Sequence, residues 1–385
     1  MATIGERLQS VRKRRALSQR QLAQESDVSL SLIRKLEQGE RSTARTATLR
    51  SLAVALDVPT MVLLGDNPEP PDAADDAMWA PVGHALAAPA DSDALEPGTE
   101  HGLADALAAA VKLYHDNRYD DLSRVLPGLI RDAQGASPLL RSRVLQLTGS
   151  LMVQTRQRDS ARMALDRSLS DAERSGSILD AASAVITLCW LMLLEAQFEQ
   201  VRTMAIEWAD RIEPRLSAAT VPHLSTWGWL LLRASAAAIR DNRPDQAAEM
   251  MRLAQAAAVV VGRERGSYHA YWTTFGPATV AMKRVENAVI DGRPDIALRL
   301  AEAVPPGLRP TSDNRNRHLL DVAAAHLDLK RYPEGFDVLR QLSNDAPVWL
   351  VNQRAAKDLL HTIITKRRTL TADVRELADR IGLEY

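Results

Sequence analysis

Apolar residues recur at three- and four-residue intervals in five short stretches of the first 66 residues, and this spacing predicts five helices. Ile4, Leu8 and Val11 mark the buried side of the first helix, and the basic run 12–15 suits its negative end. The starts of the later helices are marked by Ser18 with its capping-box partner Gln21, by the caps Ser29 and Thr46, and by Pro59. The pattern therefore predicts a small all-α domain over residues 1–66.

Only the short turn around Asp27 and Val28 separates the second of these helices from the third. Two helices joined in this way, after a basic first helix, form the helix-turn-helix arrangement that places its second helix in the DNA major groove. Two plainer interpretations stand beside this one. A basic run on a helix is usually a solvated face, and helix-turn-helix geometry also occurs in domains that do not bind DNA.

The stretch from Leu17 to Arg41 resembles the XRE family of phage-repressor-like regulators, and the resemblance covers about residues 3–66. Its Ser-Gln, Leu-Ala, Val-Ser, Ile and Glu-x-Gly positions fall at the family spacing. Asp27 departs from the pattern, because the family often has glycine there in a left-handed turn, a conformation that Asp tolerates better than most residues. The resemblance implies a DNA-binding domain in which Glu37 pairs with Arg12 as a structural contact.

The resemblance also assigns roles to polar residues of this domain. Gln19 matches a residue that clamps phosphate, and Arg34 on the recognition helix is the best candidate for a bidentate contact to guanine. The predicted DNA-binding residues are Gln19, Ser29, Leu30, Ser31, Arg34, Lys35, Arg41 and Arg45. One small domain with this little basic surface binds weakly, so we expect a homodimer on double-stranded DNA with a palindromic operator, its half-sites about one helical turn apart.

Residues 67–102 differ sharply from what flanks them. They contain eight acidic residues, no basic residue and six prolines, whereas residues 1–66 carry a net charge of +4 and residues 103–385 a net charge of +3. No amphipathic period is evident in this segment. The composition predicts an extended, self-repelling linker between two folded domains.

From residue 103 onward the sequence is helical in pattern and it repeats. Six segments share a polar centre between an Ala/Leu-rich amphipathic stretch and a second apolar run. Their aligned positions, spaced by 39, 40, 46, 50 and 38 residues, are Asp120, Asp159, Glu199, Asp245, Asp295 and Pro333. A single helix pair cannot bury its apolar faces, so the pattern predicts an α-solenoid of stacked helix pairs over residues 103–385.

These units resemble tetratricopeptide repeats in degenerate form. A helix-turn-helix head followed by such repeats resembles a large group of actinobacterial regulators and, more loosely, the peptide-sensing repeat regulators of Gram-positive bacteria. The segments that begin at Trp272 and at Arg317 look like motifs of the actinobacterial group. The resemblance implies a head governed by a repeat domain that dimerises and senses an effector.

A ligand site is expected on the concave face, which in a solenoid is lined mainly by the first helix of each pair. Aromatic residues cluster just before Gly276 and Pro277, which are predicted to begin a helix that carries Thr279 on the same polar stripe as two of the candidates. The candidate ligand residues are Trp229, Arg233, Tyr271, Trp272, Phe275, Lys283 and Asn287. In the alternative interpretation, the aromatics fill gaps between Ala-rich helices and the polar stripe faces solvent.

The composition and the absence of known motifs exclude several classes of fold and function. Hydrophobic residues make up 46% and charged residues 25%, which excludes wholesale disorder, and 4% aromatics favour helices over a β-sandwich. Neither a nucleotide-binding glycine motif nor a zinc-protease motif occurs, and Cys189 lies in an apolar run typical of a core thiol, so we expect no enzyme, no cofactor and no metal. The longest uncharged apolar stretch, between Asp180 and Glu195, is too short for a bilayer, which indicates a cytoplasmic protein without membrane contact.

The sequence thus predicts a sequence-specific transcription regulator whose repeats dimerise and sense a peptide or small-molecule effector. The alternative belongs to the interaction class. In it the repeats form a scaffold that docks a protein partner, and no diffusible ligand exists.

Overall fold

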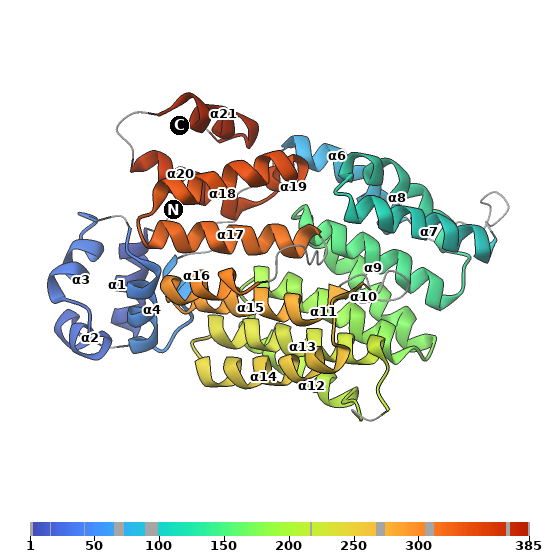
Figure 1. Ribbon diagram of the computed structural model, residues 1–385, viewed down its shortest axis with the longest axis horizontal. Coiled ribbons are helices and arrows are strands. Elements are labelled where there is room, and N and C mark those ends of the chain that lie inside the picture. Colours follow the sequence, from blue (N-terminus) through green and yellow to red (C-terminus); the bar gives the residue numbers. More distant parts are fainter. Residues whose placement is uncertain are drawn as a thin grey trace.

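The computed structural model describes residues 3–15, 17–41, 43–64, 73–88, 99–215, 218–266, 274–304, 312–366 and 370–383, and these are almost entirely helical (Figure 1). The first five helices form a compact head with its own core around Leu8, Leu22, Ile33 and Leu52. They are α1 (Ile4–Arg14), α2 (Gln19–Ser26), α3 (Leu30–Glu37), α4 (Thr46–Ala55) and α5 (Thr60–Leu64).

The caps of the head helices follow the sequence prediction at most positions. Ser18 and Gln21 form the predicted capping box of α2, and the Ser29 side chain accepts a hydrogen bond from the Leu32 amide at 3.3 Å. Asp27 has a φ of 54°, so the left-handed turn is made as predicted by an Asp in place of a glycine. The fourth helix is an exception, because Thr46 is its first helical residue and Arg45 holds the cap position without a side-chain bond.

The segment predicted to be an extended linker contains a helix, and the prediction is wrong there. Helix α6 (Ala73–Ala87) runs through Pro81 and buries Trp79, Val82 and Leu86 against α8 (Tyr119–Ala133) and α10 (Arg158–Arg174). The acidic composition masked three apolar residues spaced three or four apart, which is one helical face. Residues 65–72 and 89–98 lie outside the described part of the chain.

Beyond α6 the described chain forms six consecutive pairs of helices. The first helices of the pairs are α7 (Glu100–His115), α9 (Pro138–Gln154), α11 (Ile178–Leu194), α13 (Val221–Arg240), α15 (Pro277–Ile290) and α17 (Ser312–Asp328). The second helices are α8, α10, α12 (Phe198–Arg211), α14 (Pro244–Val261), α16 (Pro294–Glu302) and α18 (Tyr332–Asp345). Three short helices, α19 (Pro347–Val351), α20 (Arg354–Thr365) and α21 (Ala372–Arg380), follow them.

All six polar segments identified in the sequence coincide with the turns of these pairs. Each turn carries one residue with a φ between 56° and 70°, namely Asn117, Arg156, Ala196, Asn242, Gly292 and Lys330. The left-handed residue reverses the chain within three residues, so the two helices of each pair pack against each other. A short antiparallel pair, β1 (Arg265–Gly266) and β2 (Thr274–Phe275), lies between α14 and α15 with Arg265 opposite Phe275.

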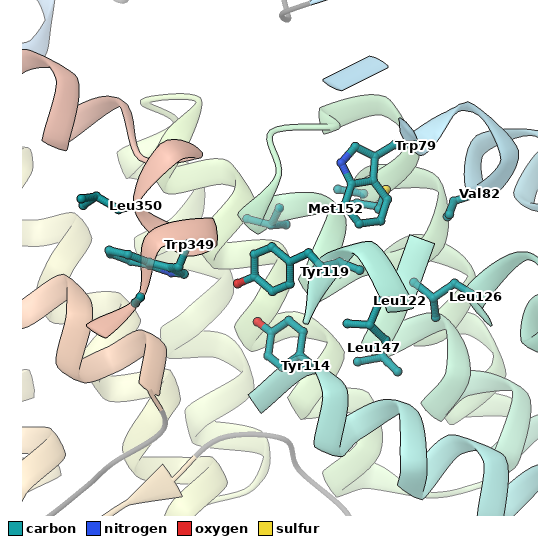
Figure 2. Packing of buried hydrophobic residues seen from close by; sticks show 14 of the residues in the cluster. Trp79, Val82, Tyr114, Tyr119, Leu122, Leu126, Leu147, Met152, Trp349 and Leu350 are labelled. Carbon is teal, nitrogen blue, oxygen red and sulfur yellow. The ribbon is translucent and has the colours of Figure 1, made fainter. Parts of the chain in front are cut away.

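The array of pairs turns back on itself, so that its last helices meet its first (Figure 1). One hydrophobic cluster contains Tyr114 of α7, Tyr119 of α8 and Trp349 of α19. Figure 2 shows the hydroxyl ends of both tyrosines directed toward Trp349, with Trp79 of α6 above Tyr119 in this view. A hydrogen bond of 2.7 Å from Gln154 of α9 to Asp313 of α17 joins the second pair to the sixth.

The core between the helices is built largely from small residues. On α13, for example, Ala234, Ala237 and Ala238 are fully buried, which permits close approach of neighbouring helices and accounts for the low aromatic content. Cys189 on α11 is also fully buried, as the sequence predicts for a core thiol, and burial raises its pKa to about 12. No helix in the described part of the chain combines the length and the apolar character needed to cross a membrane.

The head packs against one edge of the array through α4 and α5. Asn242, in the turn of the fourth pair, donates a hydrogen bond of 2.8 Å to the Val58 carbonyl and also contacts Thr60. Arg50 on α4 forms an ion pair with Asp291 in the turn of the fifth pair. A Cβ at Gly292, whose φ is 70°, would lie 2.9 Å from the Ala47 backbone, so this turn approaches the head too closely for a side chain.

Candidate functional site

The face of the head opposite to the array carries α3, the helix predicted to read DNA. Ser29, Ser31, Arg34 and Lys35 are exposed there, while Ile33 and Leu36 on the other side of the helix are buried in the head core. Leu30 is half-buried at the first helical position. The helix thus presents hydroxyl and cationic groups along one side, which are the donors and acceptors that base edges and phosphates bind.

A buried ion pair fixes α3 relative to α1 and α2. The Arg12 guanidinium donates to both carboxylate oxygens of Glu37, at 2.7 and 2.8 Å, as the sequence predicts, and Gln19 donates to Glu37 at 2.8 Å. Burial alone would raise the pKa of Glu37, but the hydrogen bonds from Arg12 and Gln19 outweigh it and hold the pKa below its ordinary value. Gln19, predicted to clamp phosphate, therefore also orients the recognition helix.

Arg41 and Arg45, the two predicted DNA contacts that follow α3, are both exposed. Arg41 donates to the Thr43 carbonyl at 3.0 Å, which holds its side chain along the loop between α3 and α4. Arg45 lies close enough to Asp328, at the end of α17, to oppose the rise that burial causes in the pKa of that carboxyl. Arg45 therefore stands at the boundary between the head and the array.

A second candidate site is a cavity of about 260 Å³ inside the array. Its lining comes from the first helices of all six pairs, together with Ala355 of α20. This is the concave face on which the sequence analysis expected a ligand. The polar and aromatic lining residues central to the argument are Gln146, Gln154, Trp190, Trp229, Arg233, Lys283, Glu286, Asp313, Arg317 and Asp321.

Two guanidiniums in this lining rest on indole rings. The Arg233 guanidinium lies 5.1 Å from the Trp229 ring centre and 5.8 Å from that of Trp190, and the Arg317 guanidinium lies 4.9 Å from the Trp190 ring centre. Arg233 donates from Nε to the Ile186 carbonyl at 3.1 Å, and Arg317 donates to Gln154 at 2.8 Å. Among the described residues neither guanidinium has a carboxylate within 4.0 Å.

The other charges of the cavity are arranged as a compact cluster. Glu286 accepts from Arg240 at 2.6 Å and from Lys283 at 2.7 Å. Burial would raise the pKa of Glu286, yet these two cations lower it, so Glu286 is ionised at neutral pH. Burial and the charge of Glu286 together raise the pKa of Asp321 to about 8, which leaves Asp321 largely protonated.

Two buried acceptors in the lining lack a donor in the described part of the chain. The Gln146 amide nitrogen donates to the Ser183 carbonyl at 3.0 Å and to Thr187 at 2.8 Å, but its Oε1 has no partner in the described part of the chain. The Oδ1 of Asp313 is likewise unpartnered there, and burial raises the pKa of this carboxyl to about 6. Unpartnered buried acceptors are uncommon in folded proteins, and each one requires an explanation.

The predicted ligand residues divide into three groups. Trp229, Arg233 and Lys283 line the cavity. Phe275 does not, because it is fully buried against Gly228, and Asn287 does not, because its amide donates to Ser235 at 2.8 Å. Tyr271 and Trp272 lie outside the described residues.

Gln146, Trp190, Gln154 and Asp321 were not predicted as site residues, and Arg317 was noted only as the start of a motif. A partial signal was present, because amide and charged residues occur on the first helices α9 and α17 beside their apolar positions. Charged and amide groups that recur on the first helices, at positions that face inward, mark a polar cavity. Six helices line this cavity, and the sequence pattern of a single helix does not show how the six are rotated relative to one another.

Residues 3–63 match the family model described as "Helix-turn-helix domain", so this part of the chain is a helix-turn-helix domain. Over 59 residues the chain is 41% identical to the HTH-type transcriptional repressor RghR, and equally to the uncharacterized HTH-type transcriptional regulator RghRB, both of Bacillus subtilis. The aligned part is 15% of this chain, 44% of RghR and 42% of RghRB, so the chain spans less than half the length of these relatives. No solved structure matches the chain.

Proposed function

We propose that the protein is a DNA-binding transcriptional regulator of the XRE type. The observation that carries the proposal is the exposed polar side of α3, which is held by the Arg12–Glu37 pair and faces away from the array. The two related proteins are both named as transcriptional regulators, and their sequence similarity to this chain covers 59 residues, as expected for the head domain. Insertion of α3 into the major groove would bring Ser31, Arg34 and Lys35 to base edges and phosphates.

The helix pairs of residues 100–345 are proposed to form a tetratricopeptide-like solenoid that senses an effector in its cavity. The support is that the first helices of all six pairs line one polar cavity with cationic groups and two unpartnered buried acceptors. A scaffold for a protein partner would require an accessible binding surface, and an internal cavity favours a diffusible ligand. We further propose a cytoplasmic homodimer that acts by binding and not by catalysis.

Binding of a ligand can alter DNA affinity only if it stabilises one placement of the heads over another. The head contacts the turns of the fourth and fifth pairs, and the first helices of those same pairs, α13 and α15, carry Arg233 and Lys283. A shift of these helices around a ligand would therefore move the surface on which the head rests.

The test is selection of bound fragments of genomic DNA by the full-length protein, followed by affinity measurements on the selected sites. Arg34→Ala is expected to relax sequence preference, with a loss of about 1–3 kcal/mol on the best site. Arg252→Ala on α14, which removes the same charge from an exposed position in the array, serves as the control and should leave binding unchanged. Retention of every fragment with equal affinity would contradict the proposal, and sedimentation as a single copy on duplex DNA would contradict the dimer.

A further inference from the structure

The cavity in the array has an excess of positive charge. Arg233, Arg240, Lys283 and Arg317 line it, against the ionised carboxylates of Glu286 and Asp313, with Asp321 largely protonated. Arg240 and Lys283 share the single negative charge of Glu286, and the charge of Arg317 acts on Asp313, so four cations face two ionised carboxylates. Among the described residues Arg233 has no carboxylate within 4.0 Å.

Two other guanidiniums of the array show the contrasting arrangement. The half-buried Arg141 and Arg143 of α9 have carboxylate partners, at 2.7 Å from Asp171 and at 2.8 Å from Asp180. The Arg233 guanidinium has indole faces instead. Cation–π contacts are weaker than the cost of removing an unpaired ion from water, so they do not replace a carboxylate partner.

One turn of α11 anchors both Arg233 and Gln146. Arg233 is anchored on the Ile186 carbonyl, and Gln146, whose Oε1 lacks a donor, is anchored on Ser183 and Thr187. A molecule that occupies the cavity would therefore meet cationic donors and an empty acceptor within the same short stretch of wall. Leu147, Ile186 and Leu320 supply apolar surface between them.

The volume suits a small molecule. At about 260 Å³ the cavity falls just below the range of about 300–1,000 Å³ typical of drug-sized ligands.

We propose that the cavity binds a compact organic anion, whose acidic group contacts Arg233 and Arg317 and which also donates a hydrogen bond to Gln146 or Asp313. The inference rests on the proposed effector site and names its ligand class. Carboxylates and phosphates share the chemistry that a pair of guanidiniums recognises, through short charge-assisted hydrogen bonds. The apolar wall selects an organic body over a free inorganic ion.

The test is isothermal titration of the full-length protein, without DNA, with three probes of similar shape. They are 4-hydroxyphenylacetate, 4-hydroxyphenyl phosphate and the uncharged 4-hydroxyphenylacetamide. We expect at least one anion to bind tenfold or more tightly than the amide, since a hydrogen bond between two charged groups is stronger than one to a neutral group. The better of the two anions identifies the acidic group.

Two variants connect the affinity to the cavity. Arg233→Met and Arg317→Met should each lower the anion affinity at least tenfold. Both variants should fold, because each replaces a half-buried cation, which has no carboxylate within 4.0 Å among the described residues, with an apolar side chain. Arg162→Met, which removes a guanidinium from α10 outside the cavity, should leave the affinity unchanged.

The proposal is overturned if no anion of the set binds more tightly than the amide, or if both cavity variants retain the wild-type affinity for the anion. Since no DNA is present, these outcomes are independent of the regulator function. A protein that binds the anion but selects no DNA would contradict the proposed function and leave the ligand site standing.

Discussion

The Arg12–Glu37 pair should dominate the stability of the head, and Glu37→Gln tests this. The Glu37 side chain is 1% exposed and that of Arg12 10%, so neither group can recover water when its partner is lost. The Gln amide replaces one of the three accepted hydrogen bonds with a repulsive N–H and leaves the Arg12 cation without a counter-charge. Breaking a buried pair from one side costs about 3–5 kcal/mol, and because Gln retains one acceptor we expect about 3 kcal/mol.

For a domain of this size, 1 kcal/mol lowers the unfolding midpoint by about 4–8 °C, so the head should melt roughly 12–24 °C lower in the variant. Two optical signals separate the head from the array. All seven tryptophans follow residue 78, so tryptophan fluorescence reports the array alone, whereas circular dichroism at 222 nm reports both. Glu37→Gln should produce an early loss of dichroism with no change in fluorescence.

The matched control is Asp57→Asn, which breaks the exposed pair with Arg15 at 3.2 Å and should cost about 0–1 kcal/mol. The effect of Glu37→Gln should also depend on pH. The folded-state pKa of Glu37 lies below its ordinary value, so its stabilising contribution is complete above about pH 4.3 and is lost as pH falls through the lowered pKa. A variant no less stable than Asp57→Asn at pH 7 would refute the reasoning.

Three further predictions concern the array. Asn242→Gly keeps the left-handed turn but removes the bonds to Val58 and Thr60, so hydrogen exchange in α5 should accelerate, whereas Lys330→Gly should leave α5 unchanged. Cys189 should resist a thiol reagent until the protein is unfolded, and rapid labelling of native protein would contradict its burial. Because the folded-state pKa of Asp313 is raised to about 6, its ionisation destabilises the array as pH rises from about 4 to 6, by roughly 3 kcal/mol, and Asp313→Asn should abolish that loss in urea titrations.

The sequence was sufficient to predict the head and the turns of the array, because both depend on local signals. Ser18, Asp27 and Ser29 act on the backbone within three residues, and each lies where the sequence analysis expected it. The helix α6 was missed because its apolar face is short and surrounded by acidic residues and proline, and its partners lie on α8 and α10. Helix α6 is stabilised by packing against α8 and α10, and the local sequence pattern does not reveal these contacts.

The sequence predicted the candidate ligand residues correctly only where the pattern of a single helix determines which side chains face the cavity. Arg233 and Lys283 face inward with the first helices of their pairs, as expected. Phe275 was wrongly predicted to bind ligand, because an aromatic residue beside a polar stripe can lie either in the hydrophobic core or in a ligand site. The close packing of its ring against Gly228 shows that Phe275 belongs to the core. Gln146 and Arg317 come from helices far apart in the sequence, and the closure of the array brings them to one cavity.

The seating of the head on the fourth and fifth pairs has a consequence for the order of events during synthesis. The head leaves the ribosome first and contains its own core, but the turns that hold it, at Asn242 and Gly292, are translated much later. At about 5–20 residues per second the interval is roughly 10 to 45 s. Throughout this interval the α4–α5 surface is uncovered beside a growing chain, so the nascent protein has a head free to meet DNA before the array can restrain it.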